Sequence, residues 1–328
     1  MHAPHAPRHV AFVVYPGIQL LDVTGPAAVF GMVNEVVARP SYQITAVSDG
    51  GGLVSSSCGL TLDTRDLEQV SGIAFDTVLV GGGEEDAITC QFANVRLRNW
   101  MEAQTHRVRR YGSVCTGAFV LAEFGLAQNR TVTTHWEGAG ILANDYPDLT
   151  VNANALYVSD GQLWSSAGVA TGIDMSLAMV EEDHGKEVAN AVAKRLVLYA
   201  RRPGFQSQFS PVLNAQARVG ADPTFGTLIE WMRQHLQEPL DSARLAQQVA
   251  LSERSFYRKF VAATGKTPAE FVELLRLDVA KQLFEQHASL KEVAFHTGFA
   301  NTKRLTRAFE RHFGMTPALF RELHVSAN

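Results

Sequence analysis

Residues 293–317 read VAFHTGFANTKRLTRAFERHFGMTP, and this stretch predicts two short helices joined by a tight turn. Ser289 and Glu292, just before it, have the S-x-x-E spacing of a capping box, so the first helix is expected to begin directly after Ser289. Gly298 is expected to end that helix, and Asn301 is a favourable N-cap for the next one. The stretch is therefore expected to fold as a helix-turn-helix unit.

The second of these helices has two chemically different faces. Leu305 and Phe309 are four residues apart and are expected to face the protein interior. Polar side chains share the opposite face, namely Thr302, Lys303, Thr306 and Arg307. A short helix with one apolar face and one face of Lys, Thr and Arg suits a DNA major groove. For this stretch alone, an ordinary surface helix with a solvated charged face remains the alternative.

The same design occurs one unit earlier, over residues 245–268, and this repetition favours the DNA-binding interpretation. From the second helix of each unit onward, residues match at an offset of 49: Arg258 with Arg307, Phe260 with Phe309, Gly265 with Gly314, and Thr267-Pro268 with Thr316-Pro317. Before that helix the offset is 48, as for Leu245 and Val293, so the second turn is expected to contain one extra residue. Self-similarity at a fixed offset indicates a duplicated structural unit. Thr267 and Glu270 form another capping box, which opens a long helix expected to hold the two units at a fixed separation.

Residues from about 223 to 324 resemble the DNA-binding domain of AraC/XylS-type transcriptional regulators. The matching pieces occur in the family's order: Leu245-Ala246, Ser252, Phe256, Arg258, Phe260, Gly265, Thr267-Pro268, Arg276-Leu277, Ala280, Val293-Ala294, Gly298-Phe299, Leu305, Arg307, Phe309, Gly314 and Pro317. The resemblance implies seven helices, with two helix-turn-helix units that enter successive major grooves of double-stranded DNA. It gives these candidate DNA-binding residues: Ser252, Arg254, Tyr257 and Arg258 in the first unit, and Asn301, Lys303, Thr306 and Arg307 in the second.

The length of 328 residues favours two domains rather than one. From residue 223 to the end there are 14 Lys and Arg against 11 Asp and Glu, a net charge of +3. The first 222 residues carry 15 against 22, a net charge of −7, and the two values give the overall −4. The small positive excess of the C-terminal part suits contact with phosphates, whereas the acidic part does not.

Two further features bear on the location of the protein. The N-terminus lacks the layout of a signal peptide, and no run approaches the 18 apolar residues of a membrane span. The cysteines, Cys58, Cys90 and Cys115, are odd in number and lack metal-type spacing. A cytoplasmic protein without metal or cofactor is therefore expected.

Residues 9–200 alternate between predicted strands and helices. Short apolar runs predict buried strands at Val10–Tyr15, Ile44–Val47, Thr77–Val80 and Tyr111–Val114. Helical patterns follow at Pro26–Val37, Val95–Thr105, Asp174–Glu182 and Glu187–Ala200. This alternation predicts a mostly parallel sheet covered on both faces, with a hairpin around Asp160-Gly161. Residues 201–222 are polar and irregular, which predicts a linker to the domain at 223–324.

The segment Ser113-Val-Cys-Thr-Gly-Ala118 is the chemically notable part of this first domain. It predicts a strand that enters a sharp turn with Cys115 at the bend, followed by a helix whose dipole would favour the thiolate. Val80-Gly-Gly-Gly83 ends another strand, and its backbone N–H groups are expected at the same edge of the sheet. Asp22 and His135 are candidates to add a carboxylate and an imidazole there. A structural cysteine in a tight turn and a core histidine are the alternative.

Residues 9–200 also resemble the ThiJ/PfpI domain of the class I glutamine amidotransferase-like superfamily. The matching pieces are Leu21-Asp-Val-Thr-Gly-Pro26, Val80-Gly-Gly-Gly83, Cys115-Thr-Gly-Ala-Phe119, Leu121-Ala122, Gly125-Leu126, Thr133-Thr-His-Trp136, Ser166-Ala-Gly168 and Thr171-Gly-Ile-Asp174. The resemblance implies a flavodoxin-like sandwich, frequent dimerisation, and an acidic residue beside the cysteine, here Asp22 beside Cys115. The protease-like branch has histidine after the cysteine, where this chain has Thr116; Cys-Thr with an upstream aspartate resembles the isonitrile hydratase branch.

The two resemblances together match the GlxA/FtrA-like group of bacterial regulators. That implies an activator controlled by a small, often nitrogen-containing effector, with RNA polymerase as a partner and a homodimer as the assembly. The candidate ligand-binding residues are Asp22, Gly82, Gly83, Cys115, Thr116 and His135. Two alternatives remain open at this point: a cysteine-dependent hydrolase or hydratase with an appended DNA-binding domain, and a redox sensor that acts through oxidation of Cys115.

Overall fold

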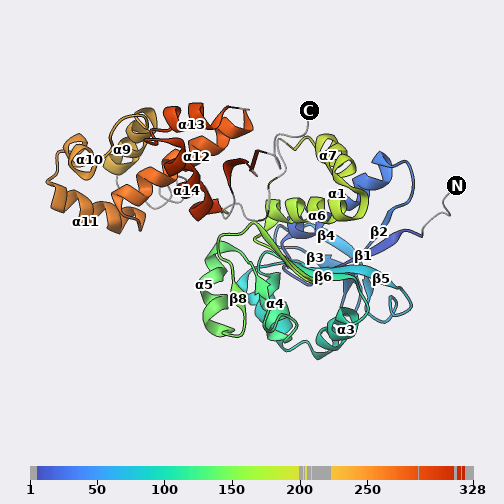
Figure 1. Cartoon of the computed structure of the whole chain (residues 1–328). Coiled ribbons are helices and arrows are strands. Elements are labelled where there is room, and N and C mark those ends of the chain that lie inside the picture. The colour runs from blue at the N-terminus through green and yellow to red at the C-terminus, as the bar shows by residue number, and fades with distance from the viewer. Residues whose placement is uncertain are drawn as a thin grey trace. The chain divides into compact units, whose positions relative to one another are not determined.

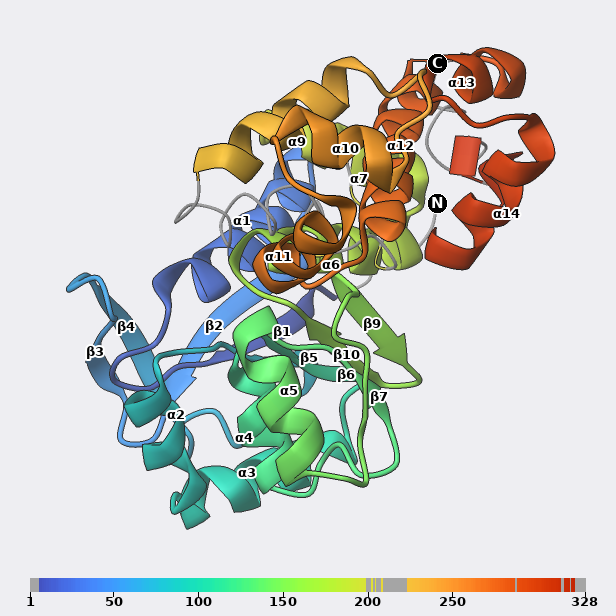
Figure 2. The same cartoon turned by 90° about the vertical axis from the view of Figure 1, so that its left-hand side faces the viewer.

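The computed structural model describes residues 6–198, 202, 204, 208, 223–286, 288–313, 316–318 and 320–321. The chain divides into two compact units, Met1–Gln208 and Phe209–Asn328, which are shown in Figures 1 and 2. Each unit has its own apolar core. Almost all of the predicted linker at 201–222 lies outside the described residues, so the linker stays a prediction.

The first unit is built on an eight-stranded sheet with the order β3-β4-β2-β1-β5-β6-β10-β9. Its strands are β1 (Arg8–Val13), β2 (Tyr42–Ser48), β3 (Gly52–Ser55), β4 (Thr61–Asp66), β5 (Phe75–Val80), β6 (Arg110–Val114), β9 (Tyr157–Asp160) and β10 (Leu163–Ser166). The neighbours from β4 to β10 pair in parallel, and only the edge strands β3 and β9 are antiparallel. The predicted parallel sheet and the predicted hairpin around Asp160-Gly161 are both confirmed. Figure 2 shows the β3–β4 hairpin at one edge of the sheet and β9 at the other.

Helices cover both faces of this sheet. They are α1 (Leu20–Val36), α2 (Glu85–Phe92), α3 (Val95–Thr105), α4 (Gly117–Glu123), α5 (Trp136–Asp145), α6 (Val169–His184) and α7 (Lys186–Arg195). Figure 1 shows α1, α6 and α7 over one face and α3 and α4 over the other. Because both faces are covered, central strand residues such as Phe12 and Leu79 are fully buried. A small parallel pair, β7 (Thr131–Val132) and β8 (Thr150–Val151), lies outside the main sheet.

Two local expectations for this unit were wrong, and two strands were not anticipated. Helix α1 begins at Leu20 and not at Pro26, which lies inside it; a turn at Gly17, with φ of 81°, delivers the chain to the helix six residues before the proline. Helix α6 begins earlier than predicted, at Val169, and Gly168 is its N-cap. Strands β3 and β4 were not predicted, since their largely exposed side chains lack a clear apolar alternation. Residues 199–200 of the last predicted helix lie outside the described residues.

The second unit is helical in all its described elements. They are α9 (Pro223–Gln234), α10 (Ser242–Gln248), α11 (Glu253–Thr264), α12 (Pro268–Glu285), α13 (Leu290–His296) and α14 (Thr302–Phe313). Residues 317–318 and 320–321 are also helical. The capping boxes predicted at Thr267 and Ser289 are present, with hydrogen bonds in both directions.

The predicted duplication is confirmed element by element. Helices α10 and α13 have seven residues each and are 48 residues apart, and α11 and α14 have twelve each and are 49 apart. The first turn, 249–252, therefore has one residue fewer than the second, 297–301. The two turns have an equivalent hydrogen bond: Leu251 N–H donates to Ala246 O, and Phe299 N–H donates to Ala294 O, each at a distance of 3.0 Å. Gly314, the counterpart of Gly265 in the sequence, lies outside the described residues, so their structural equivalence stays a prediction.

Within the second unit, helix α12 joins the two helix-turn-helix units because it contributes to the apolar cores of both. Phe271 and Leu275, in its first half, pack with Phe256 and Phe260 of α11. Leu277, Ala280 and Phe284, in its second half, pack with Leu305 and Phe309 of α14. The helix runs between the two helix pairs in Figure 1. This shared packing fixes the separation of the two helix-turn-helix units, as the sequence predicts.

None of the helices in the described ranges combines the length and the apolar character that a bilayer crossing needs.

Candidate functional site

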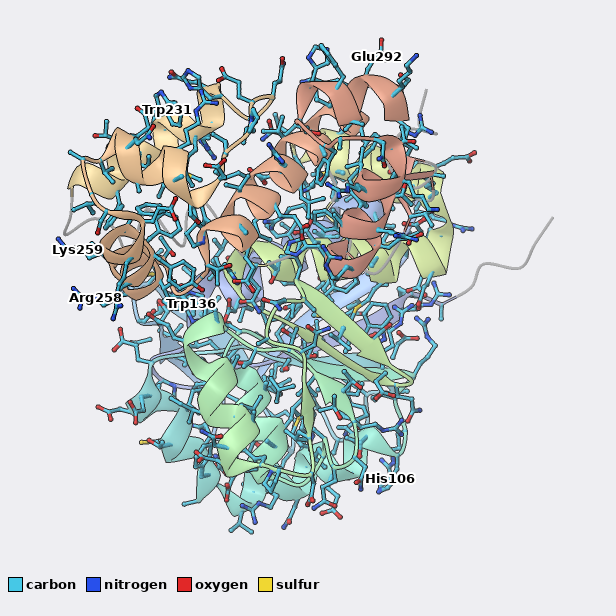
Figure 3. All side chains as sticks on the ribbon, turned by 60° about the vertical axis from the view of Figure 1, so that its left-hand side comes forward. His106, Trp136, Trp231, Arg258, Lys259 and Glu292 are labelled. Atoms are coloured by element: carbon cyan, nitrogen blue, oxygen red, sulfur yellow. The ribbon has the colours of Figure 1, made fainter. Side chains whose placement is uncertain are left out.

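The first recognition helix, α11, has a buried apolar face and an exposed face that carries its charged side chains. Phe256 and Phe260 are fully buried in the core of the second unit. Arg254, Tyr257 and Arg258 are exposed on the other side of the helix. Figure 3 shows Arg258 pointing outward from the helix. The three candidate DNA-binding residues that follow the N-cap of this helix are therefore brought together on one solvent-facing surface.

The second recognition helix, α14, repeats this arrangement. Leu305 and Phe309 are fully buried, whereas Lys303 and Arg307 are exposed and Thr306 is half-buried at the edge of the same face. Within the part of the chain that the structure describes, no carboxylate pairs with either cation. Charged side chains that are solvated and unpaired within the protein are available to a phosphate or a base edge.

Two candidate DNA-binding residues, Ser252 and Asn301, also have a structural task. Ser252 Oγ accepts a hydrogen bond from Ser255 N–H at 3.4 Å, and Asn301 Oδ1 accepts one from Arg304 N–H at 2.9 Å. Both residues are therefore N-caps, as expected for Asn301, and their oxygens are engaged with their own helices. DNA contact by these two side chains stays a prediction.

Sequence reasoning missed Lys259, which is exposed beside Arg258 on α11. Its counterpart at the offset of 49 is Ala308, which is buried on α14. Because the repeat has no cation at the second of these positions, comparison of the two copies did not single out Lys259. The mismatch of lysine with alanine was the one signal that the two helix-turn-helix units differ here.

The elbow site, defined here as Asp22, Gly82, Gly83, Cys115, Thr116 and His135, lies where β5 and β6 end. Cys115 directly follows β6 and has a φ of 58°, a left-handed conformation that is rare for a residue with a side chain. Its N–H donates to Ser166 O at 2.9 Å, and its carbonyl accepts from Thr134 Oγ1 at 2.9 Å. The predicted strand–turn–helix bend is confirmed.

Small residues surround this bend because the backbone segments approach closely. A Cβ atom added at Gly82 would lie 2.8 Å from Cβ of Cys115 and 2.7 Å from N of Thr116. One added at Gly117 would overlap the carbonyl oxygen of Val80. Larger side chains at Gly82 or Gly117 would therefore separate β5 from the elbow.

The loop that follows β5 uses its N–H groups differently from the expectation. Gly82 N–H donates to Asp22 Oδ2 at 2.9 Å. Gly83 N–H donates to Thr116 Oγ1 at 3.0 Å, and the same hydroxyl donates to Gly83 O at 2.8 Å. Gly82 and Gly83 were predicted as ligand-binding residues, and in the structure their N–H groups donate to protein acceptors. Gly82, Gly83 and Thr116 thus hold the elbow together and fix Asp22 beside it.

Asp22 and Cys115 influence each other's ionisation. Burial raises the pKa of Asp22 to about 7, against the opposing effect of the Gly82 N–H donor. Burial and then the charge of Asp22 raise the pKa of Cys115 to about 12. The expectation that the helix dipole favours the thiolate is therefore wrong, because desolvation and a nearby carboxylate outweigh the dipole of the short helix α4. The resting site holds a neutral thiol.

His135 also borders the elbow. It precedes α5, and a third of its side chain is exposed. A Cβ atom added at Gly168 would lie 3.3 Å from Cys115 Sγ and 3.6 Å from His135 Cδ2, so both side chains border the same point. The structure thus brings all six predicted residues into one region. Among the described residues, no group of three His, Cys, Asp or Glu side chains could hold a metal ion.

The raised pKa of Asp22 predicts a pH-dependent stability of the first unit. Between about pH 4 and pH 7 the folded state binds a proton at Asp22 that the unfolded chain has released, so the free energy of unfolding falls as the pH rises. We expect a loss on the order of a few kcal/mol across this window. Denaturant titrations at pH 4.5 and pH 8 should show it, and Asp22→Asn should show a flatter profile. A wild-type profile as flat as that of the variant would contradict the assignment.

Alkylation kinetics test the neutral thiol at Cys115. At pH 8 we expect iodoacetamide to label the exposed Cys58 much faster than Cys115, because the hydrogen bond with Ser56 lowers the pKa of Cys58. Asp22→Asn should accelerate labelling of Cys115, since it removes a charge that disfavours the thiolate. Peptide mass spectrometry over time measures both rates. Faster labelling of Cys115 than of Cys58 in the wild-type protein would contradict the raised pKa.

Comparison with known proteins agrees with this geometry. Residues 8–182, more than half of the chain, match the DJ-1/PfpI family, and residues 245–323 match a helix-turn-helix domain. The HTH-type transcriptional regulator GlxA of Rhizobium meliloti is 30% identical over 96% of this chain and 95% of its own length. An isonitrile hydratase of Pseudomonas putida is 32% identical, but over only 60% of this chain and 81% of its own. A ThiJ/PfpI family protein of Pseudomonas syringae shares the fold, with 22% identity and a TM-score of 0.54 over 66% of this chain and 87% of that one.

The match to a regulator covers 96% of this chain, whereas the match to an enzyme covers 60% of it. This difference in coverage favours a regulator over a hydratase. The chain therefore belongs to the DJ-1/PfpI family, as a DNA-binding transcriptional regulator in which this domain precedes an AraC-type helix-turn-helix domain.

Proposed function

We propose that this regulator binds operator DNA through α11 and α14 and changes its operator occupancy when a small molecule binds at the elbow site. The observation that carries the DNA-binding part is the repeated geometry of the second unit. Arg258 and Arg307 occupy equivalent positions on the outward faces of two helices of equal length. A shared α12 holds those helices at a fixed separation. This geometry suits two successive major grooves on one side of a duplex.

Within each groove, the side chains divide into base readers and phosphate binders. Arg258 and Arg307 lie near the middle of the exposed faces, where a guanidinium can donate two hydrogen bonds to a guanine edge. Arg254 and Lys303, one turn earlier, and Tyr257 and Thr306 extend the same faces. Lys259 suits a phosphate contact, because it lies to the side of these residues on α11.

The elbow site suits a small polar effector. Asp22 supplies a buried carboxyl, Cys115 a neutral thiol and His135 a partly exposed imidazole. These groups can accept hydrogen bonds from an amine or amide, which supports a nitrogen-containing effector. Such a molecule changes operator occupancy only if it binds the DNA-competent and DNA-incompetent states with different affinities.

We further propose that the protein acts in the cytoplasm as a homodimer and activates transcription by contacting RNA polymerase. Dimerisation is supported by exposed apolar side chains at one edge of the first unit. Leu53 lies on β3, and Leu60 lies just before β4. Leu21 is three residues after Ile18, which is hydrogen-bonded to the turn between β3 and β4. Sedimentation analysis of Leu53→Glu tests the dimer, since a charge there should produce monomers. A dimer that survives this substitution would place the interface elsewhere.

Selection of genomic DNA by the purified full chain tests the DNA-binding part. We expect a limited set of fragments to be enriched, with one motif of two half-sites about one helical turn apart. Thermal-shift screening of amines, amides and amino acids against the wild-type protein and Asp22→Asn tests the effector part. Uniform recovery of all genomic fragments would refute sequence-specific binding. A stabilising ligand that binds Asp22→Asn equally well would refute the elbow site.

A further inference from the structure

Three described residues from the segment after residue 200 are hydrogen-bonded to the first unit. Arg202, Gly204 and Gln208 are all attached to the surface of this unit. Arg202 donates from its backbone N–H and from Nε to the two carboxylate oxygens of Asp174 on α6, at 3.0 and 2.9 Å. Gly204 O accepts a hydrogen bond from Leu156 N–H at 2.6 Å, just before the edge strand β9. Gly204 therefore lies beside the start of β9, the edge strand that pairs with β10, and β10 pairs in turn with the elbow strand β6.

Gln208, the last residue of the first unit, is attached most extensively. Its backbone N–H donates to Asn154 O at 3.0 Å. Its side-chain Nε2 lies within hydrogen-bonding distance of three backbone carbonyls, those of Thr134 (3.0 Å), Ala153 (3.1 Å) and Ala155 (3.2 Å). It also approaches Thr133 Oγ1 at 3.3 Å. A carboxamide N–H₂ group is the donor that such a set of acceptors requires.

The acceptors of Gln208 are directly connected to the elbow site. Thr134, whose carbonyl accepts from Gln208, donates its own hydroxyl to the carbonyl of Cys115 at 2.9 Å. The next residue is His135, which borders the same point as Cys115 Sγ. Thr133 and Thr134 are fully buried, so neither can exchange these partners for water without moving. Any displacement of the elbow backbone therefore changes the set of acceptors around Gln208.

We propose that Gln208 is a positioning residue that transmits the state of the elbow site to the chain leading into the DNA-binding unit. This inference rests on the proposed function, because it assumes an effector at the elbow. An effector that draws His135 or Cys115 toward itself moves the Thr134 carbonyl and changes the hold on Gln208. The first residue of the second unit, Phe209, is bonded directly to Gln208. The hydrogen bonds of Gln208 are thus the point at which a change at the elbow site can reach the chain that leads into the DNA-binding unit.

A double-mutant cycle read out as operator affinity tests this coupling. Asp22→Asn, measured at pH 8, serves as the perturbation at the elbow, and the highest-affinity genomic fragment from the selection serves as the DNA. In the parent chain we expect Asp22→Asn to change the dissociation constant about fivefold or more. In Gln208→Leu, which lacks the donor, the same substitution should leave the dissociation constant unchanged. A purely structural role for Gln208 would not remove the effect of a distant substitution.

Two further variants make the cycle decisive. Gln208→Glu keeps the length of the side chain but turns an acceptor toward three carbonyls, so it should abolish the coupling as Gln208→Leu does. Gln162→Leu is the matched control, because Gln162 donates to a single backbone carbonyl, that of Val108, in the same unit. It should keep the full effect of Asp22→Asn. An equal effect of Asp22→Asn with and without Gln208, or no effect in the parent chain, would overturn the inference.

Hydrogen exchange distinguishes failure of this inference from failure of the proposed function. In Gln208→Leu we expect faster exchange over 131–137 and 152–158 and unchanged exchange in β1 and β5. If the parent chain enriched no genomic fragment, the proposed function would fail, and the exchange data would still decide the inference. Unchanged exchange over both segments would overturn it, because Gln208 would then not hold the loop that carries His135.

Discussion

Arg307→Ala is expected to weaken binding to the operator by roughly ten- to one-hundred-fold at a fixed salt concentration. The estimate corresponds to the 1–3 kcal/mol that one bidentate contact between an arginine and a guanine typically contributes. Arg307 is exposed on α14, opposite the fully buried Leu305 and Phe309, so its removal leaves the core of the unit intact. Arg258→Ala should have a similar effect at the other half-site, since the two residues are equivalent in the repeat. Fluorescence anisotropy with a labelled operator and with a scrambled fragment measures both variants.

Arg233→Ala is the control for the loss of one positive charge. Arg233 belongs to α9 of the same unit and lies 3.9 Å from Asp278, away from the faces of α11 and α14 that are assigned to DNA. It should reduce operator affinity by less than about threefold, because only screened, long-range electrostatics change. The loss for Arg307→Ala should be confined to the operator, whereas a lost phosphate contact would affect both fragments. Equal losses for Arg233→Ala and Arg307→Ala would contradict the assigned DNA-reading face.

Gly298→Ala is expected to destabilise the DNA-binding unit by about 3 kcal/mol or more. Gly298 has a φ of 71°, and a Cβ atom there would overlap the carbonyl oxygen of Leu236. That carbonyl is fixed in turn, because Arg276 donates to it from Nε at 3.2 Å and from Nη2 at 3.0 Å. The turn at Gly298 would have to move away from the backbone of Leu236, just after α9, to accommodate a methyl group. Denaturant unfolding followed by tryptophan fluorescence, in a background whose three tryptophans other than Trp231 are replaced by phenylalanine, measures the loss.

The first turn of the repeat offers a matched control. Ala250 is the residue equivalent to Gly298, and it adopts the same left-handed conformation, with φ of 53°. Ala250→Gly relieves that backbone strain but adds freedom to the unfolded chain, so stability should change by no more than about 1 kcal/mol. The comparison shows that the close approach to Leu236, rather than the backbone angle, makes glycine necessary at 298. Gly298→Ala with an effect as small as that of Ala250→Gly would contradict this explanation.

Several features of the fold could be predicted because their causes lie within a few residues. The capping boxes at Thr267 and Ser289 each satisfy backbone donors with a side chain three residues away. The buried faces of α11 and α14 follow from apolar residues at helical spacing, and the shift of offset from 48 to 49 located the longer turn. The bend at Cys115 was predictable for the same reason, because a strand, a small-residue turn and a helix follow one another directly.

The failures have a different cause. Pro26 is a start signal in isolation, but the position of α1 is set by a turn at Gly17 that brings Asp22 to the elbow. The ionisation of Cys115 was mispredicted because it depends on burial and on Asp22, which is 93 residues away in the sequence. The N–H groups of Gly82 and Gly83 were expected at the elbow, and only the packed structure shows that Asp22 and Thr116 accept their hydrogen bonds.

The sequence by itself therefore determined the order of the domains, the duplicated helix pairs and the outward faces that carry Arg258 and Arg307. These depend on hydrogen bonds and side-chain spacings that repeat every few residues. Only the tertiary structure decided the protonation of the elbow site, the attachment of Gln208 beside His135 and the need for glycine at 298. Each of these depends on atoms that are distant in the chain and meet only when the core excludes water. Desolvation and close packing, unlike helix capping, cannot be read from neighbouring residues.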